Sequence, residues 1–482
     1  MATQVAKALR VWTQSEFSNV GQGIQHSDGD YAESTGLVYD EQLRRLVPLP
    51  AFEANTLSTG FSDIKLTHYS DSIGGDAFIY ISCMRNSDNK FALQMHAAHD
   101  FSLDSTQQWS TTAVPRGVGA SRHVYMVGEN WYILGGSIFN GSDKAVAFFS
   151  TSGDFETIAA YGDRLYAALD NGDLYRLSDD TTTFELYLGA VGATSANFSF
   201  NIMKLFAYKQ ALGLVARDGG GRIHLFRIPD TYAQSWHALG VIDELTSDTI
   251  SIALETCIGE KVIVLRGDVF VLRAVSSGDD YGLFNLYRFS GSSFEVVASM
   301  RHETIGDGFG TVNVAVSITS WKGHVLLSIN KDIYIRCGSG FAVWKEGFDD
   351  AIEIHEAGDR VMATDGDAAF WNSSTDTFIT GGEVITSRLE MDAPGTEKFL
   401  HSITVLLDAE VEDVGHLTAV YYRINNNSEW TLLSATGGDG GMFLRYDEMK
   451  VRFYLLQIRV VLNNSTTGRT GISAINATFT TA

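Results

Sequence analysis

Cysteine and long apolar runs are scarce in this sequence, and each shortage excludes a class of protein. The three cysteines, Cys83, Cys257 and Cys337, lie far apart, which excludes a disulfide framework and leaves no metal-ligand spacing. Each lies in an apolar, strand-like run, which predicts a buried structural thiol. No apolar run approaches the ~18 residues that a membrane-spanning helix needs, so no membrane insertion is expected.

Positive charge and a leader-like N-terminus are also lacking. The 482 residues include 35 Lys and Arg against 58 Asp and Glu, which gives a formal net charge of −23. Binding to nucleic acid needs a basic footprint that displaces counterions, so sequence-specific recognition of nucleic acid is not expected. Residues 1–17 contain no continuous apolar stretch like that of a secretory signal. We therefore expect a soluble protein that is delivered without a Sec-type leader.

The chain has few prolines (5), many glycines (47) and 11% aromatic residues. No long segment has helical periodicity. Nearly every apolar run is four to eight residues long, alternating or β-branched, and closed by Gly, Asp, Asn or Ser. This pattern predicts an all-β chain with tight turns.

A unit of three short strands joined by polar turns recurs along the middle of the chain. It is clearest at 154–178 and returns at 202–228, 314–337 and 351–372. The spacing scatters around the ~40–50 residues expected of one four-stranded propeller blade. We therefore predict an irregular β-propeller of about seven blades over residues 61–380. Two successive β-sandwiches are the alternative, because they also produce short strands with frequent turns.

The repeat stops after Gly381-Gly382, and the strands of residues 381–482 are longer. This segment predicts a C-terminal β-sandwich or jelly-roll domain. In its longest strand, 451–462, Gln457 and Arg459 mark one face as partly solvated. Alternation predicts that the other face is continuously apolar and is formed by Tyr454, Leu456, Ile458 and Val460.

Residues 1–60 contain no repeat unit and end near Pro48 and Pro50, which enforce an extended backbone. We predict an extended N-terminal arm that pairs with the rest of the chain or with a neighbouring subunit. The alternative is a strand that closes the last blade of the propeller.

No set of residues in the sequence assembles into a catalytic or metal site. His96, His99 and Asp100 follow a strand-like run, and alternation places residues three apart on opposite faces, so we expect surface histidines. Asp-Gly pairs at 28–30 and 365–367 and an Asn-Gly pair at 170–173 lack the rest of a calcium loop and predict hairpin turns. We predict no catalytic, cofactor-binding or metal-binding residues and no enzymatic activity.

Two segments resemble fragments of the Asp-box of sialidase-like propellers. They are Ser102-x-Asp104 with Trp109, and Ser178-x-Asp180 with Phe184; Thr106 and Thr182 stand where the box has glycine. A glycosidase also needs a general acid and a second catalytic group, and the spacing assembles neither. Exposed aromatics in turns could still stack on sugars, although aromatics at blade strands are more often core residues; they are Trp131, Trp236, Trp321 and Trp371.

The C-terminal segment carries several motifs, which are Thr386-Ser387-Arg388, Glu397-Lys398-Phe399, Tyr421-Tyr422-Arg423, Trp430 and Leu456-Gln457-Ile458-Arg459. With these motifs it resembles the terminal β-domain of tailed-bacteriophage tail proteins. The resemblance covers about 100 residues, and the propeller body is similar only in architecture. It implies a hub or nozzle protein of the tail tip, which is structural, oligomeric and assembled into the virion after synthesis in the host cytoplasm.

Three functional hypotheses follow. The first is a virion structural protein that forms a ring of copies of itself around the DNA conduit and contacts neighbouring tail proteins such as the tube, adaptor or fibres. The second is a receptor-recognition or fibre-anchoring protein that binds host surface glycans. The third is a glycoside hydrolase on a propeller scaffold.

Overall fold

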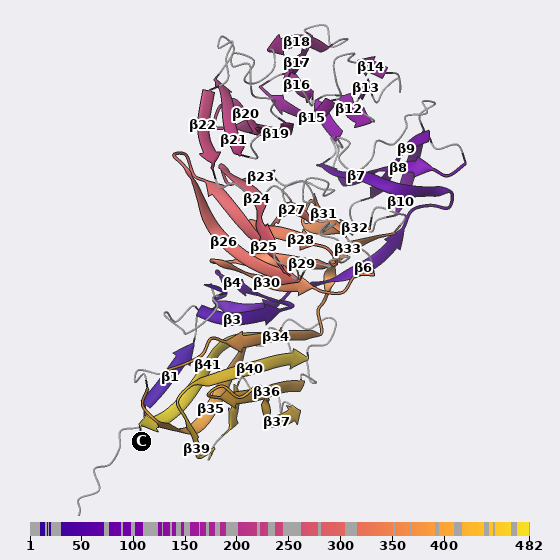
Figure 1. Cartoon of the computed structure of the whole chain (residues 1–482). Helices are drawn as coiled ribbons and strands as arrows, with labels where there is room; N and C mark the ends of the chain where they lie inside the picture. Colours follow the sequence, from indigo (N-terminus) through magenta and orange to yellow (C-terminus); the bar gives the residue numbers. More distant parts are fainter. Residues whose placement is uncertain are drawn as a thin grey trace, which may run out of the picture. The chain divides into compact units, whose positions relative to one another are not determined.

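The structure is a computed structural model, and β-strands are the only regular elements of its described residues (Figure 1). The predicted all-β class is therefore confirmed. The structure describes residues 10–14, 17, 19–20, 30–71, 77–87, 90–97, 102–108, 124–127, 129–134, 137–140, 146–148, 155–162, 164–169, 173–178, 184–188, 201–218, 222–229, 237–243, 262–277, 281–303, 316–349, 352–365, 369–390, 395–408, 417–437, 443–446, 449–463 and 470–481.

Contacts between residues divide the chain into two compact units. The first unit comprises Met1–Glu53, Asp332–Gly347 and Ser373–Ala482, and the second comprises Ala54–Lys331 and Phe348–Asn372. This grouping does not test the predicted boundaries after residues 60 and 380, which stay predictions.

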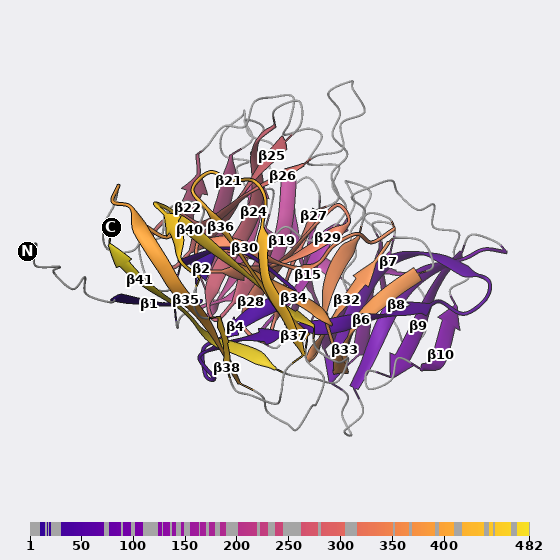
Figure 2. The same cartoon turned by 90° about the horizontal axis from the view of Figure 1, so that it is seen from below.

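The described residues of the second unit include five antiparallel sheets of four strands each, and every one of these sheets is formed by consecutive strands. Figure 2 shows the strands of the first sheet side by side. The five sheets are β7 (Phe61–Asp71), β8 (Ala77–Arg85), β9 (Lys90–Ala97) and β10 (Leu103–Gln108); β11 (Val124–Val127), β12 (Glu129–Leu134), β13 (Ser137–Asn140) and β14 (Val146–Phe148); β15 (Phe155–Tyr161), β16 (Arg164–Leu169), β17 (Leu174–Leu177) and β18 (Phe184–Leu188); β19 (Asn201–Tyr208), β20 (Ala211–Arg217), β21 (Ile223–Pro229) and β22 (His237–Ile242); and β23 (Val262–Leu265), β24 (Asp268–Ser277), β25 (Tyr281–Phe289) and β26 (Phe294–Glu303).

Two further groups of antiparallel strands follow in the second unit. They are the hairpin of β27 (Val316–Trp321) with β28 (His324–Ile329), and β31 (Glu353–Ala357) with β32 (Arg360–Thr364) and β33 (Ala369–Phe378).

The first strands of these seven groups contact one another in cyclic order. β7 contacts β11, and the contacts continue through β15, β19, β23 and β27 to β31, which in turn contacts β7. Radially arranged blades produce this order, whereas two successive sandwiches do not require it. The described part of the second unit is therefore propeller-like.

Apolar clusters fill the space between consecutive sheets. Tyr166 and Leu174 of the third sheet pack with Leu214 and Phe226 of the fourth. On its other face, the fourth sheet packs Leu225 into a cluster with Val271 of the fifth. Both faces of the fourth sheet are thus buried against neighbours, as in a stack of blades.

Hydroxyl groups on the first strands connect neighbouring groups. The Oγ1 atom of Thr157 on β15 accepts a hydrogen bond from the backbone N–H of Leu205 on β19, at 3.1 Å. The Oγ atom of Ser317 on β27 accepts one from the backbone N–H of Ile354 on β31, at 2.8 Å. The same kind of contact thus recurs at two places in the cyclic order.

The turns within these groups lie largely where the glycines predict them. Gly162, Gly323 and Gly358 have φ angles of 63°, 84° and 68° and follow the first strands β15, β27 and β31. Glycine enters this left-handed region without steric cost. At the corresponding turn after β19, Gln210 has a φ angle of 58°.

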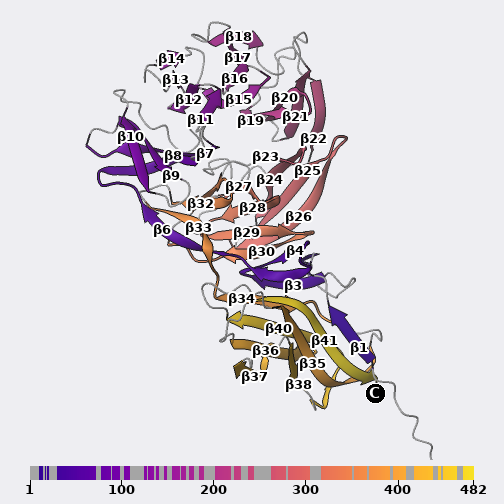
Figure 3. The same cartoon turned by 180° about the vertical axis from the view of Figure 1, so that it is seen from behind.

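The first unit is built around two groups of paired strands. One group runs in the order β38-β35-β41-β5-β4, with β1 on β41 and β39 on β35. In the other, β3 pairs with β34, β34 with β40, β40 with β36, and β36 with β37, as Figure 3 shows for β40, β36 and β37. The strands are β1 (Arg10–Gln14), β2 (Asn19–Val20), β3 (Asp30–Thr35), β4 (Leu37–Asp40), β5 (Arg45–Pro48), β29 (Asp332–Cys337), β30 (Gly340–Lys345), β34 (Gly381–Thr386), β35 (Lys398–Asp408), β36 (Leu417–Ile424), β37 (Thr431–Gly437), β38 (Phe443–Tyr446), β39 (Val451–Phe453), β40 (Leu456–Asn463) and β41 (Gly471–Thr481).

The N-terminal region contains elements of both predicted alternatives. In the first unit, β1 pairs with β41 and β3 pairs with β34, so this region pairs with the rest of the chain. In the second unit, the end of β6 (Pro50–Thr56) lies against β33, where the Asn55 side-chain amide donates a hydrogen bond to Asn372. Pairing with a neighbouring subunit stays a prediction.

The longest predicted strand, 451–462, is interrupted, and Tyr454 does not join its apolar face. Leu456, Ile458 and Val460 are fully buried, but Tyr454 is 47% exposed. The side-chain oxygen of Asn425 accepts a hydrogen bond from the Tyr454 backbone N–H at 2.8 Å, which holds the chain outside the β-ladder between β39 and β40. The prediction of one continuous face is therefore wrong for Tyr454.

Candidate functional site

The predicted surface position of His96 is wrong. Its side chain is buried, and its Nε2 atom lies 3.1 Å from the side-chain oxygen of Gln94. The imidazole also meets the ring of Phe370 edge to face, at 5.7 Å between centroids. Strand β9 thus uses this histidine as a core residue, while His99 and Asp100 lie outside the described residues.

The fragments that resemble an Asp-box do not form a site in the described part of the chain. Asp104 is exposed on β10, and Phe184 is buried with its ring 6.4 Å from that of Phe155. Phe184 therefore belongs to the core of its sheet. Trp109 and Asp180 lie outside the described residues.

Two tryptophans proposed as sugar platforms pack within the second unit. Trp321 is buried and donates from its indole N–H to the backbone oxygen of Asp359 at 2.8 Å. Trp371 is half-buried and meets Phe348 edge to face at 5.1 Å. Trp236 and the side chain of Trp131 lie outside what the structure describes.

The searched residues contain no group of three or more His, Cys, Asp or Glu side chains that could hold a metal ion. In the same part of the chain, no helix is long and apolar enough to cross a bilayer.

The buried-thiol prediction is confirmed for the two cysteines that the structure describes. Cys83 and Cys337 are both buried and free of disulfides, and Cys257 lies outside the described residues. Burial raises the pKa of the Cys337 thiol to about 11. The neighbouring Tyr31 also has a raised pKa, mainly because it is buried and partly because of Cys337. The two groups stay neutral and form a structural contact.

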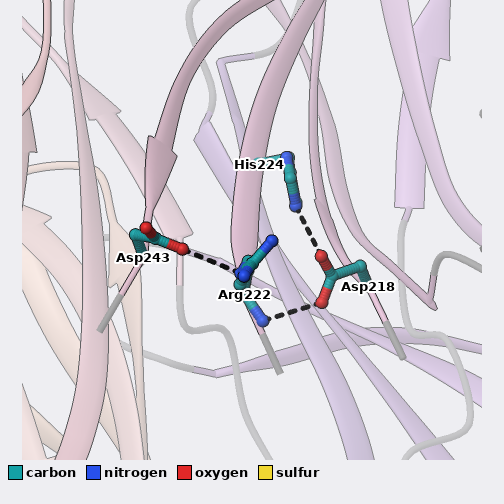
Figure 4. Close-up of polar contacts among 4 residues, drawn as sticks. All are labelled: Asp218, Arg222, His224 and Asp243. Carbon is teal, nitrogen blue, oxygen red and sulfur yellow. Dashed lines mark hydrogen bonds and ion pairs between the residues drawn. The ribbon is translucent and has the colours of Figure 1, made fainter. Parts of the chain in front are cut away.

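Four charged or titratable side chains meet where β20 and β21 are joined, next to the end of β22 (Figure 4). The buried carboxylate of Asp218 accepts a hydrogen bond from the Arg222 backbone N–H at 2.9 Å. Its other oxygen lies 2.9 Å from Nε2 of His224. Farther out, the Arg222 guanidinium forms an exposed ion pair with Asp243 at 2.8 Å. This arrangement satisfies a buried carboxylate and fixes the hairpin, which is a structural task.

A second polar group of residues lies on the third sheet. The Arg176 guanidinium stacks over the ring of Tyr187 at 5.0 Å, and it lowers the pKa of Tyr166 through charge and a hydrogen bond. Burial nevertheless raises the pKa of Tyr166 overall. The rings of Tyr166 and Tyr187 belong to or pack against the apolar cluster between the third and fourth sheets. These contacts therefore stabilise the packing of the two sheets.

Some of the residues that carry the sequence resemblance meet on one face of the C-terminal strands. Tyr421 lies opposite Arg459, and Arg423 lies opposite Gln457, in the antiparallel pairing of β36 with β40. Leu432 on β37, at the edge of the same sheet, lies opposite Tyr421, and Trp430 directly precedes β37. We call this surface the aromatic–arginine face; it is formed by Tyr421, Arg423, Trp430, Leu432, Gln457 and Arg459.

Both arginines of the aromatic–arginine face are held against aromatic rings. Arg423 lies 4.5 Å from the ring centroid of Trp430 and donates a hydrogen bond to Gln457 at 2.7 Å. Arg459 lies 5.2 Å from the ring centroid of Tyr421 and forms an ion pair with Glu383 at 2.5 Å. Such contacts fix the planar guanidinium groups and combine apolar area with positive charge.

The opposite side of the same strands is apolar and buried. Val420, Ile458 and Val460 have no exposed area. Alternation therefore separates a core side from the aromatic–arginine face, as the residue pattern of 451–462 predicts for β40. Gln457 is more buried than predicted, because Arg423 and the backbone oxygen of Thr386 both bond to its amide.

Lys398, part of the Glu397-Lys398-Phe399 motif, has an unexpected position. Its side chain is fully buried, and its ammonium donates to the backbone oxygens of Thr396 at 2.9 Å and Tyr454 at 3.4 Å. Burial lowers its pKa, and Glu390 partly opposes this effect. Lys398 thus fixes the backbone at Tyr454, where the chain is interrupted between β39 and β40.

No family model and no curated protein matches the chain. Among solved structures it is similar to BBS1N in complex with ARL6DN, at 12% identity and a TM-score of 0.43, with 67% of this chain and 96% of that chain covered. YCF48 from Cyanidioschyzon merolae gives 11% identity and a TM-score of 0.43, with 67% and 98% covered. The Cps50 (Swd1) β-propeller domain of Myceliophteria thermophila gives 10% identity and a TM-score of 0.40, with 67% and 98% covered. At this level the likeness carries no functional argument.

Proposed function

We propose that this protein is a non-enzymatic structural component that assembles with copies of itself, as a hub or nozzle at the tail tip of a bacteriophage. The resemblance of the C-terminal motifs supports the tail-tip location, and a feature of the structure supports self-assembly. The proposal includes a ring around the DNA conduit, contacts with neighbouring tail proteins, and synthesis in the host cytoplasm before assembly into the virion.

The observation that carries the proposal is the position of the exposed apolar side chains. Of eight large apolar residues that stand out from the described surface, six lie on strands at the edge of a sheet. An edge strand offers unpaired backbone N–H and C=O groups and is a template for pairing with another chain. Exposed apolar side chains on the same strands favour association. The six residues are Val11 on β1, Leu103 on β10, Leu186 on β18, Val241 on β22, Val296 on β26 and Leu432 on β37.

The proposal also includes the finer architecture. The cyclic contacts of the second unit support a seven-bladed propeller, to which the end of β6 contributes a strand. The C-terminal residues 381–482 supply β35 and β41 to one group of paired strands and β34, β36 and β40 to another, and both groups bear fully buried apolar residues such as Val405 and Val460. This supports a C-terminal β-sandwich. A rigid all-β protein of this kind is suited to a structural role in a larger assembly.

The acidic composition agrees with a position around DNA. A net charge of −23 would give a ring a negative wall, and a negative wall does not hold the phosphate backbone. A basic lumen would slow the passage of DNA.

Electron microscopy of the purified full-length chain, in negative stain and at several concentrations, tests the proposal. We expect closed rings of identical subunits, with a negative potential along the lumen in a subsequent reconstruction. A protein that stays monomeric at every concentration would contradict self-assembly. Protruding spikes on virions labelled with an antibody against this chain would favour a receptor-binding protein instead.

Attachment to host glycans is the second candidate, because the aromatic–arginine face presents Trp430 and Tyr421 beside arginines. Aromatic rings stack on sugars, and arginines bind acidic ones. Binding of the purified protein to host polysaccharide that is lost in a Trp430→Ala variant would support it. Unchanged binding in that variant would contradict it.

A further inference from the structure

We infer that a second copy of this chain docks on the aromatic–arginine face and pairs with the open edge of β37. This inference rests on the proposed function, because it names the surface through which copies would assemble. Three independent features of the described residues support it, namely the edge, the face and the charge.

The edge formed by β37 lacks the charges that protect other edges. β10, β18 and β26 carry Asp104, Glu185 and Glu295 on exposed positions, and such charges discourage pairing with another chain. β37 has the sequence TLLSATG, with no charged residue, and pairs with β36 on one side only. Its Leu432 is 49% exposed. An uncharged strand edge of seven residues that bears an exposed leucine is suited to receive a partner strand.

The edge of β22, with the sequence HALGVI, is also free of Asp, Glu, Lys and Arg. However, the exposed ion pair of Arg222 with Asp243 stands at its end, one residue beyond the strand. Two charges in this position oppose the approach of a second strand. Near β37 the described part of the structure places one exposed charge, Glu429, two residues before the strand, so β37 is the better template of the two.

The face next to this edge has the composition of an interface centre. Energetically dominant interface residues are enriched in Trp, Tyr and Arg. Trp430, Tyr421 and both arginines lie together here, half-buried and already fixed by stacking. Because the side chains are ordered beforehand, little conformational entropy remains to be lost on binding.

The charge of the face identifies the occupant. Arg423 stacks on Trp430 and donates to Gln457, and among the described residues no carboxylate pairs with it. A chain of net charge −23 repels its copies over most of its surface, whereas Arg423 gives this face a positive charge that no described carboxylate neutralises. A second acidic copy is thus steered to the aromatic–arginine face, and the β37 edge then fixes its register.

Sedimentation velocity of the full-length protein at about 0.1 M salt tests the inference, because screening is moderate there. Two variants disrupt the surface, Leu432→Lys at the edge and Arg423→Gln on the face. The matched control is Leu186→Lys on β18, which alters an exposed leucine on an edge already protected by Glu185. Circular dichroism and the unfolding midpoint of each variant establish that it folds. If one of the two disrupting variants fails to fold, the other still tests the inference.

We expect wild type and Leu186→Lys to associate equally, and each disrupting variant to weaken association at least about tenfold, equivalent to about 1.4 kcal/mol. We also expect about 0.5 M salt to reduce the difference between wild type and Arg423→Gln, because it screens the attraction between acidic groups and Arg423. Equal association of the folded disrupting variants and the control would overturn the inference and leave self-assembly intact. If Leu186→Lys weakened association as much as the disrupting variants do, the inference would also be overturned. A monomeric wild type would refute the proposed function itself, and intact self-association with lost glycan binding in Arg423→Gln would assign the face to glycans.

Discussion

The Oγ1 atom of Thr157 accepts a hydrogen bond from the backbone N–H of Leu205, 3.1 Å away, across the seam between two consecutive sheets. Thr157 is fully buried, so water cannot replace it as the acceptor. A buried N–H without a partner costs about 1–3 kcal/mol. This contact therefore contributes to holding β15 beside β19.

We predict that Thr157→Val lowers the free energy of unfolding by about 1–3 kcal/mol, because valine keeps the shape and removes the acceptor. Urea unfolding followed by tryptophan fluorescence measures the change. Thr157→Ser is the control, since it keeps the hydroxyl and loses only a methyl group, and we expect it to be the less damaging of the two. A valine variant as stable as wild type would show that the hydrogen bond contributes nothing net.

The hairpin between β20 and β21 permits a comparison of buried and exposed charge contacts. We predict that Asp218→Ala lowers the free energy of unfolding by about 1–3 kcal/mol, because the Arg222 N–H and the His224 ring lose their acceptor. Arg222→Ala removes only the exposed ion pair with Asp243 and should cost at most about 1 kcal/mol. Chemical denaturation of both variants measures the difference. An equal loss in both variants would refute the structural role of the buried carboxylate.

We predict that replacing Lys398 destabilises the first unit through both packing and hydrogen bonding. Lys398→Ala leaves a cavity and should lower the free energy of unfolding by about 2–5 kcal/mol. Lys398→Met restores most of the volume and should recover part of this loss, although the backbone oxygens of Thr396 and Tyr454 lose their donor. If methionine were no better than alanine, the ammonium contacts alone would explain the effect.

The depressed pKa of Lys398 also predicts a pH dependence. The folded state holds the proton of this lysine less tightly than the unfolded state, whose pKa is near the ordinary value of 10.5. Between the folded pKa and 10.5 the unfolded state binds more protons, so this group makes stability increase with pH. Unfolding of wild type and Lys398→Met across pH 7–10.5 measures the difference in slope. Parallel curves would contradict this prediction.

The raised pKa of Cys337 predicts an inert thiol in the folded protein. At pH 8 a thiol with a pKa of about 11 is almost entirely protonated, and only the thiolate reacts readily. Iodoacetamide labelling with peptide-level mass spectrometry should modify Cys337 only after urea is added. The neutral thiol stabilises the fold below its ordinary pKa of 9.0, and this contribution is lost as pH rises toward about 11. Rapid labelling in native buffer would refute the assignment.

Local rules predicted much of this fold, and long-range pairing accounts for what they missed. Glycines such as Gly162 and Gly323 mark turns because of their own backbone freedom, which a sequence displays directly. Alternation likewise separated Ile458 and Val460 from Arg459 on β40. Tyr454 was misplaced because Asn425, in the turn after β36, binds its backbone. His96 was misplaced because the burial of β9 depends on Phe370, which is distant in sequence.

The candidate site was predictable only in part, for the same reason. The sequence places Tyr421 and Arg423 on one side of a strand, and Gln457 and Arg459 on one side of another. That these two strands pair in register is a property of the folded sheet. The contact of Asp218 with His224 also depends on the register across a hairpin, which the glycines between them do not reveal.

The pairing of β1 with β41 has a consequence for the order of folding. Arg10 lies opposite Phe479, so a strand that leaves the ribosome early must wait for one that is synthesised much later. Until then the hydrogen-bonding groups of β1 stay available to other strands, including those of nascent neighbours on the same message. Formation of this sheet is therefore a late step, and the propeller-like unit can mature before it.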